Sequence, residues 1–265
     1  MTKKLIAIDL DGTLLDVKGR YSPATGAYLR RLSNEGHEIV LASGRPFRSM
    51  KKIYDDLQLH SPVICYNGAL VFHPADASFI PLKRSFNAST IRDLVHKTKA
   101  IVSSYMAESF DNIYINVEDD RLDRYFPYAD MKIIRGDLEQ TLKEDVYTCL
   151  FNCPIEKMGE LRAACEPIPG IGWRSWSNNT HSELFIPGSD KGAALRYVME
   201  ALGIVKEDAY AFGDAENDIS MLDASGHPFA MKENKVPSLL SRFPHTKNSV
   251  DEDGVMVALM EEFGR

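Results

Sequence analysis

The chain has 265 residues, of which 44% are hydrophobic, and its 31 basic and 38 acidic side chains give a net charge of −7. This length is large for one compact domain and suits a domain that carries a sizeable insertion. The acidic balance argues against general nucleic-acid binding, and no apolar run approaches the roughly 20 residues that cross a bilayer.

The N-terminal residues and the cysteines indicate the compartment. Lys3 and Lys4 precede the apolar run 5–8, but Asp9 interrupts that run, so we expect no signal peptide. The cysteines lack a second pair or a histidine cluster at zinc-ligand spacing, which argues against a zinc site. We therefore expect a cytoplasmic protein with buried free thiols at Cys65, Cys149, Cys153 and Cys165.

The first 72 residues alternate between strand and helix patterns. Short apolar runs, typical of a parallel sheet covered on both faces, predict strands at residues 5–8, 39–42 and 63–66. One helix is predicted to begin at Ser22-Pro23 and to stop at Gly36, and a second covers residues 50–57. Asn67-Gly68 predicts a hairpin that leads into residues 69–72.

The pattern changes after Pro81. Helix-like stretches there separate segments with strand character at residues 112–117, 147–151 and 171–176. This texture predicts an α+β module of its own, bounded near Pro81 and Pro187.

The alternating pattern then returns. A helix is predicted to open at Ser189-Asp190-Lys191 and to close at Gly203, followed by strands at 209–212 and 229–231 and a helix at 255–263. We therefore predict an α/β fold with a doubly wound, mostly parallel sheet and an inserted α+β cap. The predicted segments are core residues 1–82, cap residues 83–187 and core residues 188–265.

Polar side chains gather where the predicted parallel strands end. In an open parallel sheet, ligands bind beyond the carboxyl ends of the strands. Asp9 and Asp11 follow the first strand, Asp214 follows the strand at 209–212, and Lys191 lies in the first turn of the returning helix. The full set that we expect to converge on one crevice is Asp9, Asp11, Ser43, Asn67, Lys191, Asp214, Asn217 and Asp218.

This set of side chains fits phosphoryl transfer to a carboxylate. Mg²⁺ prefers oxygen ligands and would offset the repulsion among Asp9, Asp11 and Asp214. The Ser43 hydroxyl and the Lys191 ammonium can hold phosphate oxygens. One ionised carboxylate can then attack phosphorus, and a second can protonate the leaving oxygen and later activate water.

Each motif also has a purely structural interpretation. Asp-Gly and Ser43-Gly44 are common in plain turns, and Asp214 and Asp218 can cap the helix that follows them. Capping accounts for one acid near the start of a helix, but not for two. A lysine at a helix N-terminus opposes the helix dipole, so Lys191 needs another reason to be there. Arg45 either reaches the substrate or pairs with a carboxylate, and we leave it outside the catalytic set.

The four motifs together resemble the haloacid dehalogenase superfamily, and within it the Cof-type phosphatases with an α/β cap between the second and third motifs. Asp9-Leu10-Asp11-Gly12-Thr13 is similar to the first motif, and Ala42-Ser43-Gly44-Arg45 to the second. Ser189-Asp190-Lys191-Gly192 is similar to the third motif, and Gly213-Asp214-Ala215-Glu216-Asn217-Asp218 to the fourth. The resemblance spans the whole chain and rests on four motifs in the family's order.

The resemblance implies a role for each matching residue. Asp9 would be the nucleophile that becomes phosphorylated, and Asp11 the general acid and base. Mg²⁺ would be bound by the Asp9 carboxylate, the Asp11 backbone carbonyl and Asp214, with Asp218 contributing through water. The transferring phosphoryl group would be held by Ser43, Lys191 and Asn217 and by the backbone near Leu10 and Gly44.

We therefore expect a Mg²⁺-dependent phosphatase that hydrolyses small phosphorylated metabolites, with sugar phosphates as the favoured class, through an aspartyl-phosphate. A phosphomutase or phosphotransferase would use the same intermediate, and a non-catalytic phosphoacceptor or ligand-sensing module would use the same sheet. The expected state in solution is a monomer or a homodimer. Four cap residues either pack in the core or face the substrate, namely Trp173, Trp176, His181 and Glu183.

Overall fold

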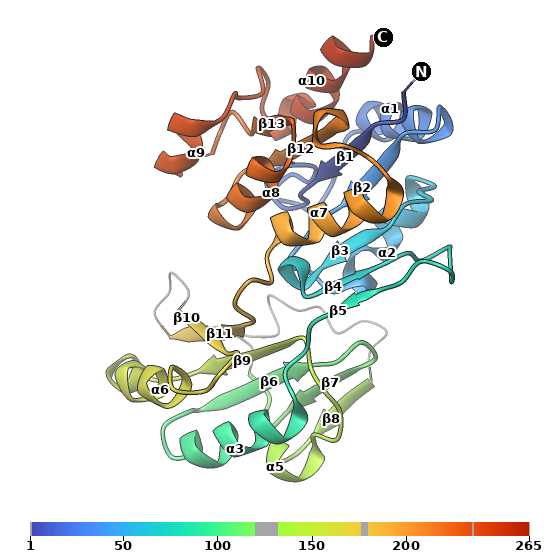
Figure 1. Cartoon of the computed structure of the whole chain (residues 1–265). Coiled ribbons are helices and arrows are strands. Elements are labelled where there is room, and N and C mark those ends of the chain that lie inside the picture. Colours follow the sequence, from blue (N-terminus) through green and yellow to red (C-terminus); the bar gives the residue numbers. More distant parts are fainter. Residues whose placement is uncertain (1, 120–131, 176–179, 235, 265) are drawn as a thin grey trace. The chain divides into compact units, whose positions relative to one another are not determined.

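The computed structural model describes residues 2–119, 132–175, 180–234 and 236–264. The chain divides into two compact units, one formed by Met1–Lys83 with Ser189–Arg265 and the other by Arg84–Gly188. We name the first unit the core domain and the second the cap domain. Figure 1 shows that both ends of the chain contribute to the core domain. Across the described ranges, no helix is long and apolar enough to cross a membrane.

The core domain is built on a four-stranded parallel sheet. Its order is β13-β12-β1-β2, formed by His227–Ala230, Ala209–Gly213, Leu5–Ile8 and Glu38–Leu41. β1 and β12 are buried along their whole length, as expected of central strands in a parallel sheet. Ile8 pairs with Phe212 on one side and with Leu41 on the other, so these three strands end at the same level.

Two helices of the core domain, α1 and α7, have the terminal signals that the sequence predicts. Ser22 caps α1 by accepting the backbone N–H of Thr25, and Gly203 ends α7 in the left-handed conformation. α9 was not predicted. The helices are α1 (Pro23–Asn34), α2 (Phe47–Asp56), α7 (Lys191–Leu202), α8 (Ile219–Ala224), α9 (Pro237–Arg242) and α10 (Gly254–Phe263). Short 3₁₀ turns lie at Tyr66–Gly68, Lys206–Asp208, Glu216–Asp218 and Val250–Glu252.

A small antiparallel sheet continues beyond β2. Its order is β3-β4-β5, formed by Val63–Cys65, Leu70–Phe72 and Leu82–Lys83. A parallel bridge between Ala42 and Ile64 connects it to the end of β2. β3 and β4 form the hairpin predicted at Asn67-Gly68, but the connection is a 3₁₀ turn over Tyr66–Gly68 rather than a two-residue turn.

The cap domain contains a six-stranded sheet of its own. The order β10-β11-β9-β6-β7-β8 corresponds to Gly172–Ser175, His181–Phe185, Thr148–Asn152, Ser104–Glu108, Asn112–Ile115 and Lys132–Arg135. Only β7 and β8 pair in parallel among these described strands. β7, β9 and β10 overlap the predicted strand segments, whereas β6, β8 and β11 were not predicted. Within the described part of the cap domain the helices are α3 (Ala88–Thr98), α5 (Leu138–Thr141) and α6 (Met158–Cys165), with a 3₁₀ turn at Ile155–Lys157.

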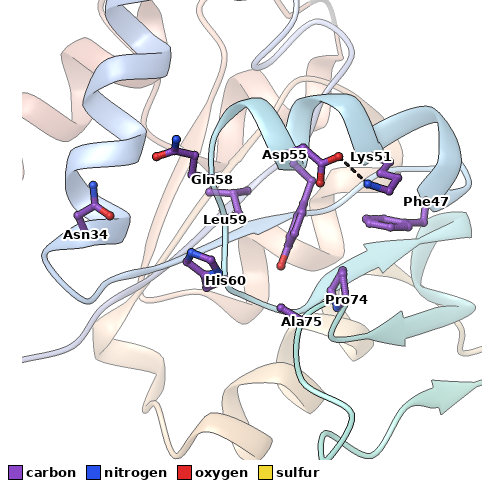
Figure 2. Close-up of a pocket in the computed structure, with 10 residues that line it drawn as sticks. Asn34, Phe47, Lys51, Asp55, Gln58, Leu59, His60, Pro74 and Ala75 are labelled. Carbon is purple, nitrogen blue, oxygen red and sulfur yellow. Dashed lines mark hydrogen bonds and ion pairs between the residues drawn. The ribbon is translucent and has the colours of Figure 1, made fainter.

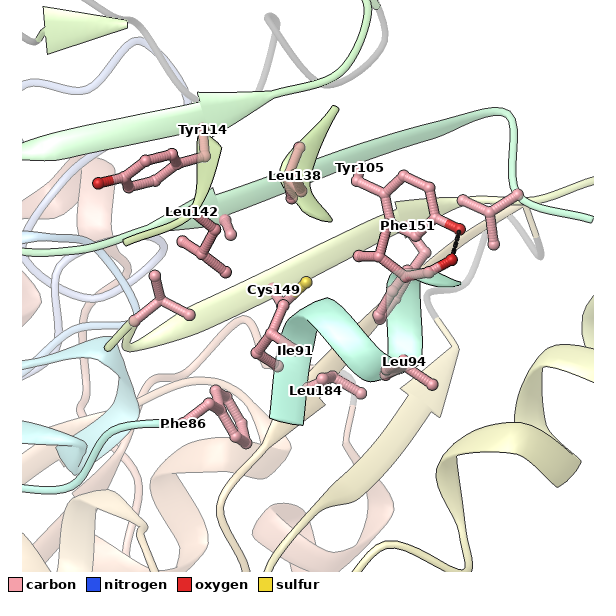
Figure 3. Close-up of a cluster of buried hydrophobic side chains, with 14 of the residues drawn as sticks. Phe86, Ile91, Leu94, Tyr105, Tyr114, Leu138, Leu142, Cys149, Phe151 and Leu184 are labelled. Atoms are coloured by element: carbon pink, nitrogen blue, oxygen red, sulfur yellow. Dashed lines mark hydrogen bonds between the residues drawn. The ribbon is translucent and has the colours of Figure 1, made fainter. Parts of the chain in front are cut away.

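The helices of the cap domain pack on one face of its sheet. Figure 3 shows Ile91 and Leu94 of α3 in the same buried cluster as Phe151 of β9. Cys149 and Cys165 belong to this cluster, and burial raises the pKa of both thiols, that of Cys165 to about 12. All four cysteines of the chain are buried and free, as the sequence predicts.

Candidate active site

Three carboxylates converge at the carboxyl ends of neighbouring parallel strands. Asp9 directly follows β1 and Asp214 directly follows β12, and the backbone N–H of Asp9 donates to the carbonyl of Phe212 at 3.0 Å. Asp218 lies four residues further on, at the end of a 3₁₀ turn. One carboxylate oxygen from each of Asp9, Asp214 and Asp218 lies within 4.8 Å of the others. Such a group of hard oxygen ligands can hold a divalent cation.

A buried lysine lies against this acidic cluster. Lys191 is the first residue of α7, and its Nζ donates to Oδ1 of Asp9 and to Oδ1 of Asp218, both at 2.5 Å. These two carboxylates explain a lysine at a helix N-terminus, where the helix dipole disfavours positive charge. Burial alone lowers the pKa of an ammonium group, but Asp9 and Asp218 raise the pKa of Lys191 above its ordinary value. Lys191 is therefore a fixed positive charge in the site.

Asp218 holds the loop after β12 as well as the lysine. Its Oδ2 atom accepts the backbone N–H groups of Asp214 and Ala215, each at 3.0 Å. The interpretation of Asp218 as a cap of the following helix is not what the structure shows: Asp218 precedes α8 but makes no side-chain capping bond to it, and its carboxylate instead satisfies backbone donors of the loop before the 3₁₀ turn. Its other oxygen pairs with Lys191, so the fully buried Asp218 joins two of the four motifs.

The crowding of buried acids changes how they titrate. Burial, and then the charge of Asp218, raise the pKa of Asp9 to about 8, although Lys191 acts in the opposite direction. Burial and Asp218 also raise the pKa of Asp214 to about 6. Both shifts mean that the site lacks positive charge when its acids are ionised. A cation held between these carboxylates would supply that charge, so the donor set fits a divalent metal ion.

Gly12 allows Asp214, which follows β12, to lie close to the loop that follows β1. Its φ is +81°, in the left-handed region that favours glycine, and a Cβ atom here would lie 2.4 Å from Oδ2 of Asp214. The Thr13 hydroxyl donates to Oδ1 of Asp214 at 3.3 Å. Leu10, two residues earlier, is fully buried. The segment that follows β1 therefore packs directly on the segment that follows β12.

The Asp11 side chain has a different environment from that of Asp9. It is 57% exposed, and its two oxygens accept Nε of Arg45 at 2.8 Å and Nη2 of Arg45 at 2.5 Å. The Asp11 carboxylate is thus not part of the group formed by Asp9, Asp214 and Asp218. The predicted metal ligand from Asp11 is its backbone carbonyl. Of the two interpretations of Arg45, the structure shows the pairing with a carboxylate, a contact that sequence reasoning did not assign to Asp11.

The remaining predicted residues lie on loops at the same strand ends. Ser43 is buried, and its Oγ accepts the backbone N–H two residues further on at 3.1 Å. The Asn217 side chain donates from Nδ2 to Oδ1 of Asn67 at 2.9 Å. Gly44 lies beside the same carboxamide, because a Cβ atom at Gly44 would be 3.1 Å from Nδ2 of Asn67. Sequence reasoning placed Asn67 at a strand end but assigned it no function.

The cap residues singled out in the sequence have varied environments. Trp173 packs against the hydrophobic cluster of the cap domain, which is the packing interpretation. Glu183 pairs with Arg174 on the neighbouring strand, and His181 is buried. Trp176 lies outside the described residues.

The core domain also has a groove that shares no residue with the acidic cluster. Figure 2 shows this groove of about 600 Å³, lined by α2 and by the segment at Pro74 and Ala75. Lys51 and Asp55 on its wall pair with each other at 2.6 Å. We therefore assign the groove no part in phosphoryl transfer.

Comparison with known proteins agrees with the geometry. A family model described as haloacid dehalogenase-like hydrolase matches residues 6–259. The 5-amino-6-(5-phospho-D-ribitylamino)uracil phosphatase YitU of Bacillus subtilis (strain 168) is 32% identical over 263 residues, which are 98% of this chain and 97% of that protein. A haloacid dehalogenase-like hydrolase from Bacteroides thetaiotaomicron has a TM-score of 0.86 at 25% identity, covering 99% of this chain and 100% of its own.

A further solved structure is that of the sugar phosphatase BT4131, described as a member of subclass IIB of the HAD superfamily. It has a TM-score of 0.76 at 21% identity and covers 99% of both chains. This likeness concerns the fold: an α/β core with an inserted cap.

Proposed function

The chain belongs to the haloacid dehalogenase-like hydrolase family, and we propose that it is a Mg²⁺-dependent phosphatase that acts on small phosphorylated metabolites through an aspartyl-phosphate. The observation that carries the proposal is the position of Asp9. It is a buried carboxylate at a strand end, anchored through one oxygen by Lys191 and surrounded by two further acids. A plain turn has no need of this arrangement.

In the proposed reaction, an ionised oxygen of Asp9 attacks phosphorus while the bond between phosphorus and the ester oxygen breaks. Asp11 gives a proton to the departing oxygen, and it then removes a proton from the water that attacks the aspartyl-phosphate. Inorganic phosphate leaves and Asp9 is regenerated as a carboxylate. Because Arg45 holds both oxygens of Asp11 in this structure, that ion pair opens before Asp11 acts.

The surrounding residues neutralise and orient the phosphoryl group. Lys191 supplies a fixed positive charge, and the Ser43 hydroxyl, the Asn217 carboxamide and backbone N–H groups near Leu10 and Gly44 supply donors. Mg²⁺ would be held by the carboxylates of Asp9 and Asp214 and the carbonyl of Asp11, beside Asp218, and would neutralise charge on the phosphate.

The proposed substrates are phosphorylated sugars and sugar alcohols. The relative YitU is named for a phosphate ester of a ribitylamino-uracil, and the structural relative BT4131 is named a sugar phosphatase. Because the proposed core site recognises phosphate, another part of the chain has to recognise the organic group. We assign that task to the cap domain, Arg84–Gly188, which lies in the sequence between the two segments of the core domain.

A panel of phosphate esters tests this function. Purified protein is assayed for phosphate release from p-nitrophenyl phosphate, sugar phosphates, sugar-alcohol phosphates and 5-amino-6-(5-phospho-D-ribitylamino)uracil, with Mg²⁺ or with a chelator. We expect turnover with Mg²⁺ and none with the chelator. Turnover that is equal under both conditions contradicts the metal dependence.

The same panel distinguishes the alternatives. Isomerised product without phosphate release indicates a phosphomutase, and transfer to an added alcohol indicates a phosphotransferase. Absence of turnover on every ester favours a phosphoacceptor or ligand-sensing module.

A further inference from the structure

The turn that follows β3 has a strained backbone. Tyr66 has φ +50° and Asn67 has φ +54°, and Gly68 follows with φ +99°. Asparagine tolerates this left-handed region, but a bulky side chain such as that of Tyr66 rarely adopts it. Such strain persists where the surrounding structure holds it and tends to cluster at functional sites. The turn therefore calls for a reason other than closing a hairpin.

The contacts of the turn lead to the candidate active site. The backbone N–H of Asn67 donates to the carbonyl of Ser43 at 3.0 Å, and that of Tyr66 donates to the carbonyl of Arg45 at 3.3 Å. Gly68 packs against the residue before Lys191, because a Cβ atom there would lie 2.4 Å from the carbonyl oxygen of Asp190. The turn thus touches two of the loops that we assign to phosphoryl binding.

The side chain of Asn67 reaches a third loop. Its Oδ1 accepts Nδ2 of Asn217 at 2.9 Å, and its Nδ2 lies beside Gly44. The left-handed backbone at Asn67 directs this carboxamide between the loop after β2 and the loop after β12. Asn217 is exposed, and its hydrogen bond to Asn67 holds its side-chain amide in one orientation.

We propose that Asn67 is a positioning residue for phosphoryl binding: it orients Asn217 and braces the Ser43–Gly44 loop, and the strained turn Tyr66–Gly68 is retained for this purpose. This inference rests on the proposed function of the site. It adds to the four motifs a residue that does not itself touch the reacting atoms. The competing explanation is that Asn67 merely closes the hairpin between β3 and β4.

The substitution Asn67→Gly separates these explanations. Glycine accepts the left-handed backbone without strain, so this variant removes the carboxamide while keeping or raising the melting temperature. We expect kcat/KM for p-nitrophenyl phosphate to fall about 10- to 100-fold, the range for groups that orient other functional side chains. The KM for the ester and the inhibition constant of inorganic phosphate should both rise.

Two further variants guard against a purely structural effect. Asn67→Ala also lacks the carboxamide but keeps the strain, so it should lose as much activity as Asn67→Gly at a lower melting temperature. Gln58→Gly is the matched control, because exposed Gln58 has φ +52° and belongs to the groove that shares no residue with the site. It should raise the melting temperature and leave kcat/KM unchanged.

A double-mutant cycle with Asn217→Ala completes the test. Because the two side chains act as a unit, the double variant Asn67→Gly/Asn217→Ala should have the same kcat/KM, within about twofold, as the less active of the two single variants. Losses that multiply, wild-type activity in Asn67→Gly, or activity that follows the melting temperature across the variants would each overturn the inference. An inactive wild-type protein instead overturns the proposed function, and this inference with it.

Discussion

The Nζ atom of Lys191 lies 2.5 Å from Oδ1 of Asp9, and both side chains are buried at the carboxyl ends of β1 and β12. Residues 182 positions apart in the chain are thus in direct contact. A carboxylate anchored through one oxygen presents the other in a defined direction, as attack on phosphorus requires. The same contact places a positive charge where the transferred group would gain negative charge.

Removal of this ammonium group should harm both activity and stability. Lys191→Ala is expected to lower kcat/KM about 10²- to 10³-fold, the range for loss of one positioned donor. It also leaves Asp218 buried without its cation, which should cost about 3–5 kcal/mol of unfolding free energy. Steady-state kinetics and urea denaturation measure the two effects. Lys52→Ala, which breaks an exposed helical ion pair, is the control and should change neither quantity.

Asp9→Asn should separate catalysis from folding. The side chain keeps its shape but cannot form an aspartyl-phosphate, so we expect turnover to be abolished. Because the fold raises the pKa of Asp9 to about 8, it disfavours the ionised form, and a neutral isostere should not lower the melting temperature of the metal-free protein. Activity within tenfold of the wild type contradicts the assignment of the nucleophile.

Binding of Mg²⁺ should strengthen as the pH rises. The carboxylates of Asp9 and Asp214 have pKa values raised to about 8 and about 6, and both have to lose protons before they bind a cation. The apparent dissociation constant should therefore fall between about pH 5.5 and about pH 8.5, with protons released on binding. Calorimetry in buffers of different ionisation enthalpy measures the dissociation constant and the number of protons released. In Asp9→Asn, the remaining pH dependence should be confined to the region near pH 6.

The same shifts predict how the metal-free protein responds to pH. A folded-state pKa above the unfolded value means that the native state binds protons more tightly, so stability falls as the pH rises through that interval. Because of Asp9 and Asp214, the melting temperature without metal should therefore decrease from about pH 4 to about pH 8. Added Mg²⁺ should raise the melting temperature, and the increase should be largest at the alkaline end of this range. A metal-free melting temperature that increases across this interval contradicts the shifts.

Gly12→Ala should damage the acidic cluster specifically. The new methyl group would meet Oδ2 of Asp214 at 2.4 Å, so this carboxylate has to move. Gly19→Ala is the matched control, since Gly19 also has a positive φ, +72°, but nothing lies within 4 Å of its would-be Cβ. Both variants should lose stability through backbone strain. Only Gly12→Ala should weaken Mg²⁺ binding, by about tenfold or more, and equal binding in both variants argues against the assigned role of Asp214.

The core of the fold was predictable because its signals are local. Central parallel strands are continuous apolar runs such as Leu5–Ile8, and caps such as Ser22 and Gly203 mark helix ends. The convergence of Asp9 and Asp214 follows from one topological rule about strand ends. That rule needs only the order of strands and helices, which the sequence shows clearly.

The strands of the cap domain were less predictable because contacts between residues distant in the sequence determine where they form. β6 carries Ser104 and Glu108 at fully buried positions, so its apolar pattern is interrupted. The hydroxyl of Ser104 donates to Asp119, which also accepts the side chain of Asn152 on β9, and such a network has no local signature. The orientation of the exposed Asp11 side chain was likewise not predictable from the sequence, because it depends on an ion pair with Arg45 on another loop.

Acid quenching followed by mass spectrometry shows whether Asp9 becomes covalently phosphorylated. Asp11→Asn, in which hydrolysis of the intermediate should be slow, is mixed with p-nitrophenyl phosphate and Mg²⁺ and quenched during the first turnover. We predict a peptide that contains Asp9 and is heavier by one HPO₃ group, and its absence when Asp9→Asn is added. Phosphate release with no such peptide, or with the added mass on another residue, would show that Asp9 is not the nucleophile.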